Sequence, residues 1–177
     1  MAPGSRPSRL DVGCVFDEHF DYVWSTLQRL GIREVDLEDL AHEVFLRVHA
    51  RLDQYDRTRP IRPWLFGFAY RIAADHRRLA RHRMELLVEV ESIDPRPSAD
   101  DAMASREQRA LLRAALDAMD IESRALLVAH HVDGVAVPEI ADALGIPLNT
   151  AYSRLRLART KLAAATNDLT KEEVRRA

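Results

Sequence analysis

The side chains with the clearest chemical potential in this sequence are basic and hydrogen-bonding, and they gather in the last third of the chain. Four positive charges lie in Arg154–Lys161, with no acidic residue among them. Just before them, Asn149, Tyr152 and Ser153 add neutral hydrogen-bonding groups. Arginine and lysine neutralise phosphate, and arginine also matches the paired acceptors on a guanine edge. The chemistry that this segment predicts is recognition of DNA.

A second basic segment lies earlier in the chain, in Arg71–Arg83, with a net charge of +4. Phe66 and Tyr70 precede its arginines, and aromatic rings interleaved with arginines suit stacking on unpaired bases beside phosphate contacts. For Phe66 and Trp64 we favour the alternative, packing in the core. Glu85–Glu107, between the two basic segments, carries a net charge of −5. The total charge of −2 is therefore a poor guide, because phosphate contacts depend on local patches.

No set of residues that could catalyse a reaction is evident. His42–Glu43 begins like a zinc-protease helix, but Leu46 stands where the second histidine would be required. His130 and His131 are adjacent, hence about 100° apart on a helix and poorly placed to share a metal ion. Neither a glycine-rich phosphate loop nor a nucleophile elbow is present. We predict no enzymatic activity, no catalytic residue, no metal site and no cofactor.

Composition limits the class of protein. A length of 177 residues suits one large or two small domains, and 47% hydrophobic with 31% charged residues is typical of a globular chain. Cys14 is the single cysteine, so no internal disulfide can form and a reducing cytoplasm is expected. No apolar run approaches the ~18 residues of a membrane span, and the first residues lack a signal-peptide core, so no membrane insertion is expected.

Hydrophobic periodicity predicts an all-α protein. In the first half, helices are expected from Cys14 to Leu30, from Leu37 to Leu52 and from Pro63 to Arg83, with Asp36 as the N-cap of the second. A polar loop, 53–63, precedes the third helix. Two further helices are expected around 111–119 and 123–132.

Val137–Leu162 predicts two helices joined by a tight turn. Pro138 suits the first turn of a helix, Gly145 can take the positive φ that ends one, and Pro147 prevents its continuation. Ala136 stands where a capping serine would stabilise the first of these helices. The second has an apolar stripe at helical spacing, made of Leu148, Ala151, Leu155, Ala158 and Leu162. Two such helices with a basic outer face form a helix-turn-helix, whose second helix fits a DNA major groove.

The predicted organisation is two small helical domains joined by a flexible acidic linker. In chain order it comprises a flexible N-terminus (1–13), a first helical domain (14–84), the linker (85–104), a helix-turn-helix domain (105–165) and a polar tail (166–177).

Three motifs in this order resemble those of the extracytoplasmic-function (ECF) group of bacterial RNA polymerase sigma factors. Asp36–Val48 is similar to that family's core-binding helix, Pro63–Arg78 to its promoter helix, and Gly134–Leu162 to its C-terminal helix-turn-helix. The first domain is then region 2-like and the second region 4-like. The resemblance implies a sigma factor that binds core RNA polymerase, recognises the −35 and −10 promoter elements, assists DNA melting and directs transcription initiation.

The resemblance also implies roles for particular residues. Core polymerase, through the coiled coil of its largest subunit, would be bound by Asp39, His42, Glu43, Leu46 and Arg47. Binding and melting of the −10 element would fall to Arg59, Arg62, Trp64, Tyr70, Arg71, Arg77, Arg78 and Arg81. The −35 element would be bound by Asn149, Thr150, Tyr152, Ser153, Arg154, Arg156, Arg159 and Lys161. Of these last, Tyr152, Ser153 and Arg156 would reach base edges, and the others would mostly hold phosphates.

Two other functions stay open at this stage. A helix-turn-helix repressor or regulator that acts without the polymerase core explains the C-terminal half but not the first domain. A non-catalytic helical adaptor would use its basic patches only as solvated faces. Members of the family commonly have an anti-sigma partner. The sequence does not say whether this protein has one, and it does not give the promoter, the inducing signal, the oligomeric state or the placement of the two domains.

Overall fold

The computed structural model describes residues 11–86 and 112–176. Within these residues the chain forms helices and connecting turns without a strand, which confirms the all-α prediction. The helices are α1 (Val12–Arg29), α2 (Glu34–His49), α3 (Ile61–Leu86), α5 (Ile121–Leu127), α6 (Val137–Leu144) and α7 (Leu148–Arg176). Two short elements accompany them, a 3-10 turn η1 (Leu52–Gln54) and a π-helical segment η2 (Val128–Val132) that continues α5. Residues 112–117 are also helical. None of the described helices is long and apolar enough to cross a membrane.

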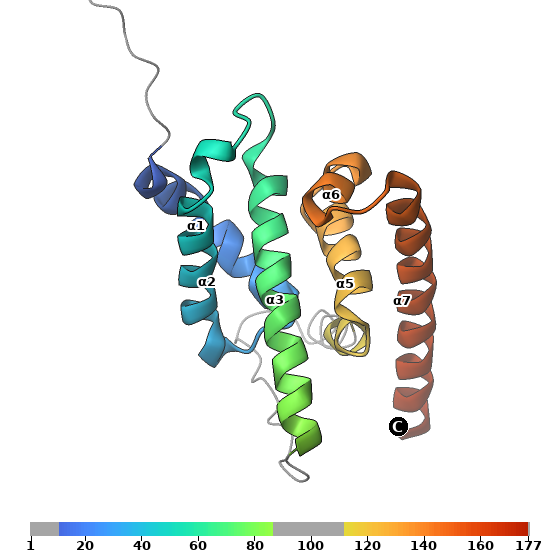
Figure 1. Ribbon diagram of the computed structural model, residues 1–177. Coiled ribbons are helices and arrows are strands. Elements are labelled where there is room, and N and C mark those ends of the chain that lie inside the picture. The colour runs from blue at the N-terminus through green and yellow to red at the C-terminus, as the bar shows by residue number, and fades with distance from the viewer. Residues whose placement is uncertain (1–10, 87–111, 177) are drawn as a thin grey trace, which may run out of the picture.

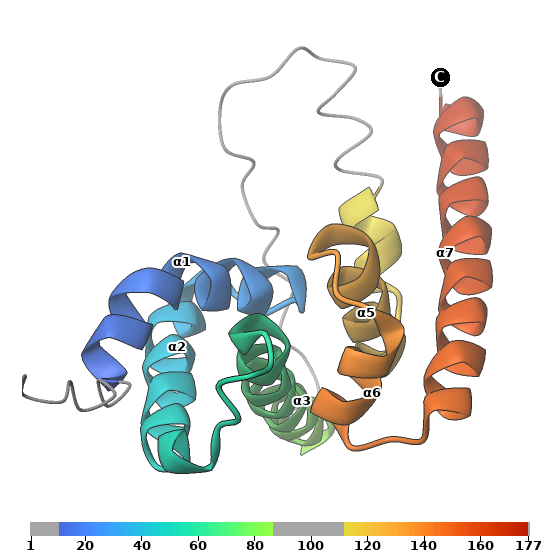
Figure 2. The ribbon, with the colours of Figure 1, turned by 90° about the horizontal axis from the view of Figure 1, so that it is seen from above.

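The two halves of the chain lie directly against each other. In Figure 1, α1, α2 and α3 form one group, and α5 and α6 lie between α3 and α7. Figure 2 shows the same order from above. Contact between the halves runs mainly from α3 to α6. The structure thus decides a point that the sequence left open, the placement of the two domains.

A single apolar cluster runs through both halves. It joins Leu27 of α1 and Val44 of α2 to Ile140 of α6 and Leu155 of α7. Phe66 of α3 is fully buried in this cluster, so the prediction that its ring packs in the core is confirmed. Because α3 packs on α1, α2 and α6, it is covered on more than one side.

The start of α2 differs from the prediction. The N-cap is Arg33 rather than Asp36, because the helix begins at Glu34. Asp36 therefore lies inside the first turn, where a carboxylate is favoured by the helix dipole. It accepts a hydrogen bond from Arg33 Nε at 3.0 Å, so the residue still supports the helix start without capping it.

The helix-turn-helix forms as the turn residues indicate. Ala136 is the N-cap of α6, and the Glu139 carboxylate accepts from its backbone N–H at 3.4 Å, which offsets part of the missing capping side chain. Gly145 ends α6 with φ of 68°. In α7 the side chains of Ala151, Leu155 and Ala158 are buried, as the stripe predicts, but Leu148 at the start of the helix is 43% exposed.

The ends of the predicted segments need adjustment. Helix α7 continues past its apolar stripe to Arg176, so the predicted polar tail from 166 is part of this helix. Residues 12 and 13 belong to α1, and 85 and 86 to α3. The remainder of the predicted flexible N-terminus, apart from Asp11, and of the predicted linker lies outside the described residues.

Candidate nucleic-acid interface

Helix α7 turns its hydrogen-bonding side outward. Its buried stripe packs toward α5 and α6, so the opposite side faces solvent. Tyr152 is 52% exposed there, and Asn149, Ser153 and Arg156 are exposed beside it. This face combines a phenol, an amide, a hydroxyl and a guanidinium, the groups that can bond to base edges.

Three other cations of α7 are held by partners in the same half of the chain. Arg154 Nη1 lies 3.1 Å from Glu122 Oε2, Lys161 Nζ lies 2.5 Å from Asp120 Oδ2, and Arg159 Nε donates to His131 Nε2 at 3.0 Å. Within the described residues the Arg156 guanidinium has no such partner. The four cations among the predicted −35 residues are thus of two kinds. Three are anchored, which means paired with another side chain of the described residues, and Arg156 is displayed without such a partner.

Among the side chains that pair with these cations, Asp120 is itself held by several hydrogen bonds. Its carboxylate caps α5 by accepting from Ser123 N at 2.8 Å, and it also accepts from Ser123 Oγ at 2.9 Å. Partial burial would raise the pKa of Asp120, but the bonds from Lys161 and Ser123 prevail and lower it to about 2.

The start of α3 and the preceding loop form a group of aromatic rings and arginines. Trp64 packs edge-on against Phe68, with ring centroids 4.9 Å apart, and in a tilted arrangement against Tyr55 at 4.8 Å. The Arg62 guanidinium lies over the Tyr22 ring at 5.3 Å. Arg59 lies on the loop and pairs with Asp142 of α6 at 2.9 Å.

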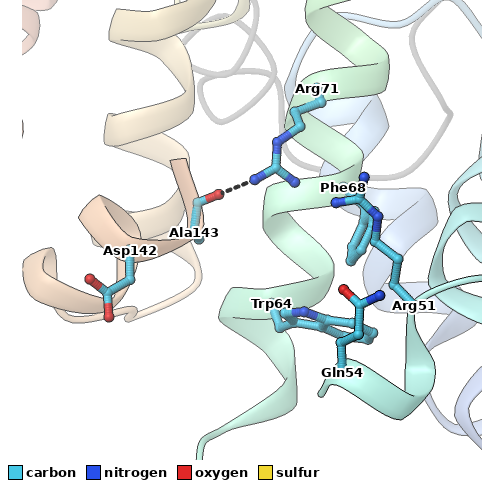
Figure 3. Close-up of a pocket in the computed structure, with 7 residues that line it drawn as sticks. All are labelled: Arg51, Gln54, Trp64, Phe68, Arg71, Asp142 and Ala143. Carbon is cyan, nitrogen blue, oxygen red and sulfur yellow. Dashed lines mark hydrogen bonds between the residues drawn. The ribbon is translucent and has the colours of Figure 1, made fainter. Parts of the chain in front are cut away.

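A cavity of about 180 Å³ lies between these groups and α6 (Figure 3). It is lined by Arg51, Gln54, Trp64, Phe68 and Arg71 from the first half and by Asp142 and Ala143 from α6. Arg71 Nη2 donates to Ala143 O at 2.9 Å. Burial, together with the neighbouring charges of Arg51 and Arg47, lowers the pKa of Arg71. Such a concentration of positive charge beside aromatic rings fits a nucleotide.

Five of the seven lining residues were not predicted as site residues from the sequence: Arg51, Gln54, Phe68, Asp142 and Ala143. Arg51 stands four residues after Arg47, just beyond the end of α2, and the nearness of these two charges in the sequence was a usable signal. Gln54 and Phe68 carried none, because Phe68 belongs to the apolar stripe of α3 and Gln54 to a polar loop.

The other predicted −10 residues lie farther along α3. Tyr70 is half-buried, and its pKa is raised by burial and by Glu122. Arg77 Nη1 donates to Leu30 O at 3.2 Å, and Arg78 Nη2 pairs with Asp75 Oδ1 at 3.2 Å. The structure therefore brings Arg59, Trp64 and Arg71 together and leaves Arg77 and Arg78 outside the cavity. The side chain of Arg81 is not among those described.

The outer face of α2 has the features of a protein-binding surface. Leu46 is 69% exposed, and beside it Arg47 Nη2 pairs with Glu43 Oε1 at 2.5 Å. His42 and Asp39 are also exposed on this helix. An exposed leucine flanked by charges suits a partner helix, and all five predicted core-binding residues lie on α2.

Charged groups are buried where the two halves meet. Arg124 of α5 is 4% exposed and donates to the backbone carbonyl of Arg29 and to Asp117. Arg29 Nη1 in turn lies 2.7 Å from Asp133 Oδ1. Burial raises the pKa of Asp133 despite the nearby Arg29. Among residues 11–86 and 112–176, no cluster of three or more His, Cys, Asp or Glu could hold a metal ion.

Comparison with known proteins accounts for both halves. The sigma-70 region 2 family model matches residues 15–83, and the sigma-70 region 4 model matches residues 109–162. The ECF RNA polymerase sigma factor SigL of Mycobacterium tuberculosis is 32% identical over 145 residues, which cover 81% of this chain and 82% of SigL. The chain belongs to the ECF sigma factors. It is a transcription initiation factor, as the sequence predicted, and the region 2 match explains the half that a repressor would leave unexplained.

Other members of the family are similar to this chain in sequence and in structure. The RNA polymerase sigma factor CnrH of Cupriavidus metallidurans is 30% identical over 145 residues, covering 76% of this sigma factor and 75% of CnrH. The solved complex of CnrH with the cytosolic domain of CnrY matches with a TM-score of 0.64 at 25% identity, over 89% of this chain and 88% of CnrH. The sigma factor RpoE of Bartonella quintana, solved with the anti-sigma factor NepR, matches with a TM-score of 0.70 over 88% and 96% of the two chains. At 16% identity that match supports the fold alone.

Proposed function

We propose that three separate faces of this sigma factor carry its function. The outer face of α7 reads the −35 element, the cavity side of α3 with its preceding loop holds the −10 strand, and the outer face of α2 binds core polymerase. The observation that carries this proposal is that each of the two sigma modules has one helix on which arginines and hydrogen-bonding or aromatic groups gather.

At the −35 element, α7 lies in the major groove. Tyr152, Ser153 and Arg156 face base edges, since their exposed side chains have few competing partners. Asn149, Thr150, Arg154, Arg159 and Lys161 hold phosphates. In the free protein the last three are paired with Glu122, His131 and Asp120, and phosphate would share or replace these partners.

At the −10 element, the region 2 wall of the cavity takes an unpaired base. Trp64 and Phe68 offer ring surface, and stacking of a base on an aromatic side chain contributes ~1–3 kcal/mol. Arg51 and Arg71 supply charge for the adjoining phosphates, with Arg59 beside them. A strand held in this way stays separated from its complement, which is how the protein assists melting without chemistry of its own. Arg62, Tyr70, Arg77, Arg78 and Arg81 extend the contact along α3.

Two partners complete the proposal. The coiled coil of the largest polymerase subunit lies on α2 against Asp39, His42, Glu43, Leu46 and Arg47, with Leu46 as the apolar centre. The complex of CnrH with the cytosolic domain of CnrY supports a second protein partner, which we propose is an anti-sigma factor. A protein with these partners works in the cytoplasm and has no enzymatic activity.

Run-off transcription tests the proposal. Purified core polymerase, with and without the full-length protein, is given a pool of promoters from the source genome. We expect initiation at a distinct set of starts that share two spaced elements. Salt-sensitive binding to duplex DNA without any initiation would contradict it and favour a regulator that acts without polymerase.

The core-binding face is tested by Glu43→Lys combined with Arg47→Glu. We expect loss of co-purification with core polymerase and unchanged circular dichroism, because both side chains lie on the surface and an exposed pair stabilises a helix by only about 0.5 kcal/mol. The control is Arg33→Ala, at the N-cap of α2, which breaks a 3.0 Å ion pair with Asp36 outside the proposed face. Undiminished co-purification of the double variant would place the interface elsewhere.

A further inference from the structure

We propose that the last turn of α6 competes with the −10 strand for the same binding site on α3. This proposal rests on the proposed role of the α3 cavity. It adds that, in the free protein, the −10 site is already occupied by a segment of region 4. The −10 strand enters only after α6 leaves α3.

Two contacts place α6 on the proposed −10 face. Asp142 Oδ2 lies 2.9 Å from Arg59 Nη1, and Ala143 O accepts from Arg71 Nη2 at 2.9 Å. Figure 3 shows Arg71 reaching from α3 to the Ala143 carbonyl across the cavity. Both α6 residues also line that cavity. The arginines that we assign to DNA are therefore engaged by the other half of the same chain.

The chemistry of this turn resembles that of a phosphate. Asp142 supplies a carboxylate, and Ala143 supplies a carbonyl oxygen at the C-terminal end of α6, where the helix dipole is negative. Arginine binds carboxylate and phosphate oxygens with the same donor geometry. An acidic helix end and a nucleic-acid backbone are thus alternative ligands for Arg59 and Arg71.

The close approach of α6 depends on Gly67. A Cβ atom at this position would lie 2.7 Å from the Ala143 carbonyl oxygen, nearer than any real Cβ contact. The three nearest heavy atoms from outside α3 all belong to Ala143. The glycine therefore leaves room for the backbone of α6, and that backbone takes the space that a strand would need on the same side of α3.

The ionic part of the contact is weak. Arg59 and Asp142 are each 65% exposed, and an exposed ion pair contributes little to stability because water screens it. When the competent form is a minor fraction, the apparent affinity for a ligand falls in proportion to that fraction. A mutation that releases α6 should then strengthen binding at α3 without adding any contact to DNA.

The test measures binding of a fluorescent single-stranded oligonucleotide that carries the −10 sequence of a promoter found in the run-off assay. The variants are Gly67→Ala, which displaces α6 sterically and keeps every arginine, and Asp142→Ala, which removes the carboxylate. The control is Asp21→Ala, an exposed residue of α1 with the same change of charge as Asp142→Ala. If about one molecule in ten is open, we expect up to about tenfold tighter binding by Gly67→Ala, a smaller gain for Asp142→Ala and none for the control.

Opening is measured separately by energy transfer between dyes on the exposed Cys14 and on a cysteine introduced by Ala164→Cys. We expect Gly67→Ala to change the transfer efficiency without oligonucleotide, and the wild type to change it only when oligonucleotide is added. Unchanged affinity or unchanged transfer in Gly67→Ala would overturn the competitor proposal while the wild type still initiates transcription. Failure of the wild type to initiate would instead overturn the proposed function itself.

Discussion

Helices α3 and α7 carry the same kind of sequence but differ in what their neighbours leave open. Each has an apolar stripe with arginines on the remaining surface. The stripe of α7 packs on α5 and α6, and its other face displays Tyr152 and Arg156. Helix α3 packs on α1 and α2 and meets α6 as well, so Arg71 is engaged by Ala143. A basic helix face identifies DNA-binding chemistry, but its accessibility depends on the neighbouring helices.

Small side chains explain why α3 accepts a second neighbour. Gly67 allows backbone contact with α6, and Ala69 and Ala73 are fully buried on the same helix. On the outer face of α7, Tyr152 and Arg156 are large and solvated, which disfavours close packing of another helix. The difference between the helices therefore lies in side-chain volume as much as in charge.

The largest expected effect tests what holds the halves together. Arg124→Ala should lower the free energy of unfolding by about 2–3 kcal/mol, because it removes a buried guanidinium and leaves the Arg29 carbonyl unsatisfied. Urea denaturation of the full-length protein measures it. Arg113→Ala, at an exposed position, is the control and should change little. Equal midpoints for the two variants would mean that the halves are held chiefly by apolar packing.

The next effect tests the division between displayed and anchored cations on α7. Arg156→Ala should cost about 1–3 kcal/mol at one base position of the −35 element and relax the preference there. Lys161→Ala should weaken binding evenly across promoter variants and reduce the salt dependence, because this ammonium is fixed by Asp120 and would reach only phosphate. Binding to a set of single-base promoter variants distinguishes the two. Uniform losses from both substitutions would refute the assignment of roles.

The smallest effect concerns the Asp120 anchor. Its pKa is lowered from 3.8 to about 2, so the stability that the carboxylate contributes is present above about pH 4 and is lost as the pH falls toward 2. The side chain is 45% exposed, so after solvent screening we expect roughly 1 kcal/mol. Urea midpoints of the wild type and Asp120→Asn should differ at pH 6 and converge near pH 2. A difference that persists at pH 2 would show that the charge of Asp120 is not its cause.

Much of the local structure follows from the sequence alone. Gly145 and the flanking prolines give the helix-turn-helix turn, and the spacing of Ala151, Leu155 and Ala158 gives the buried side of α7. The exposed face of α2 around Leu46 follows from the same periodicity. Each of these features depends on residues within one or two helical turns of each other. A periodic pattern in the sequence gives information over that separation.

Only the tertiary structure decides how the halves meet. Arg71 and Ala143 are 72 positions apart in the chain, and Arg29 and Asp133 are 104 apart. Arg51 and Gln54 join Trp64 at the cavity because the loop after α2 folds back over the start of α3. Such contacts depend on helix packing, and no periodicity along the chain encodes which distant helix lies opposite. The sequence by itself determined which helix faces carry clustered arginines and hydrogen-bonding groups, and the packing of α6 on α3 determined that the face around Arg71 is partly covered.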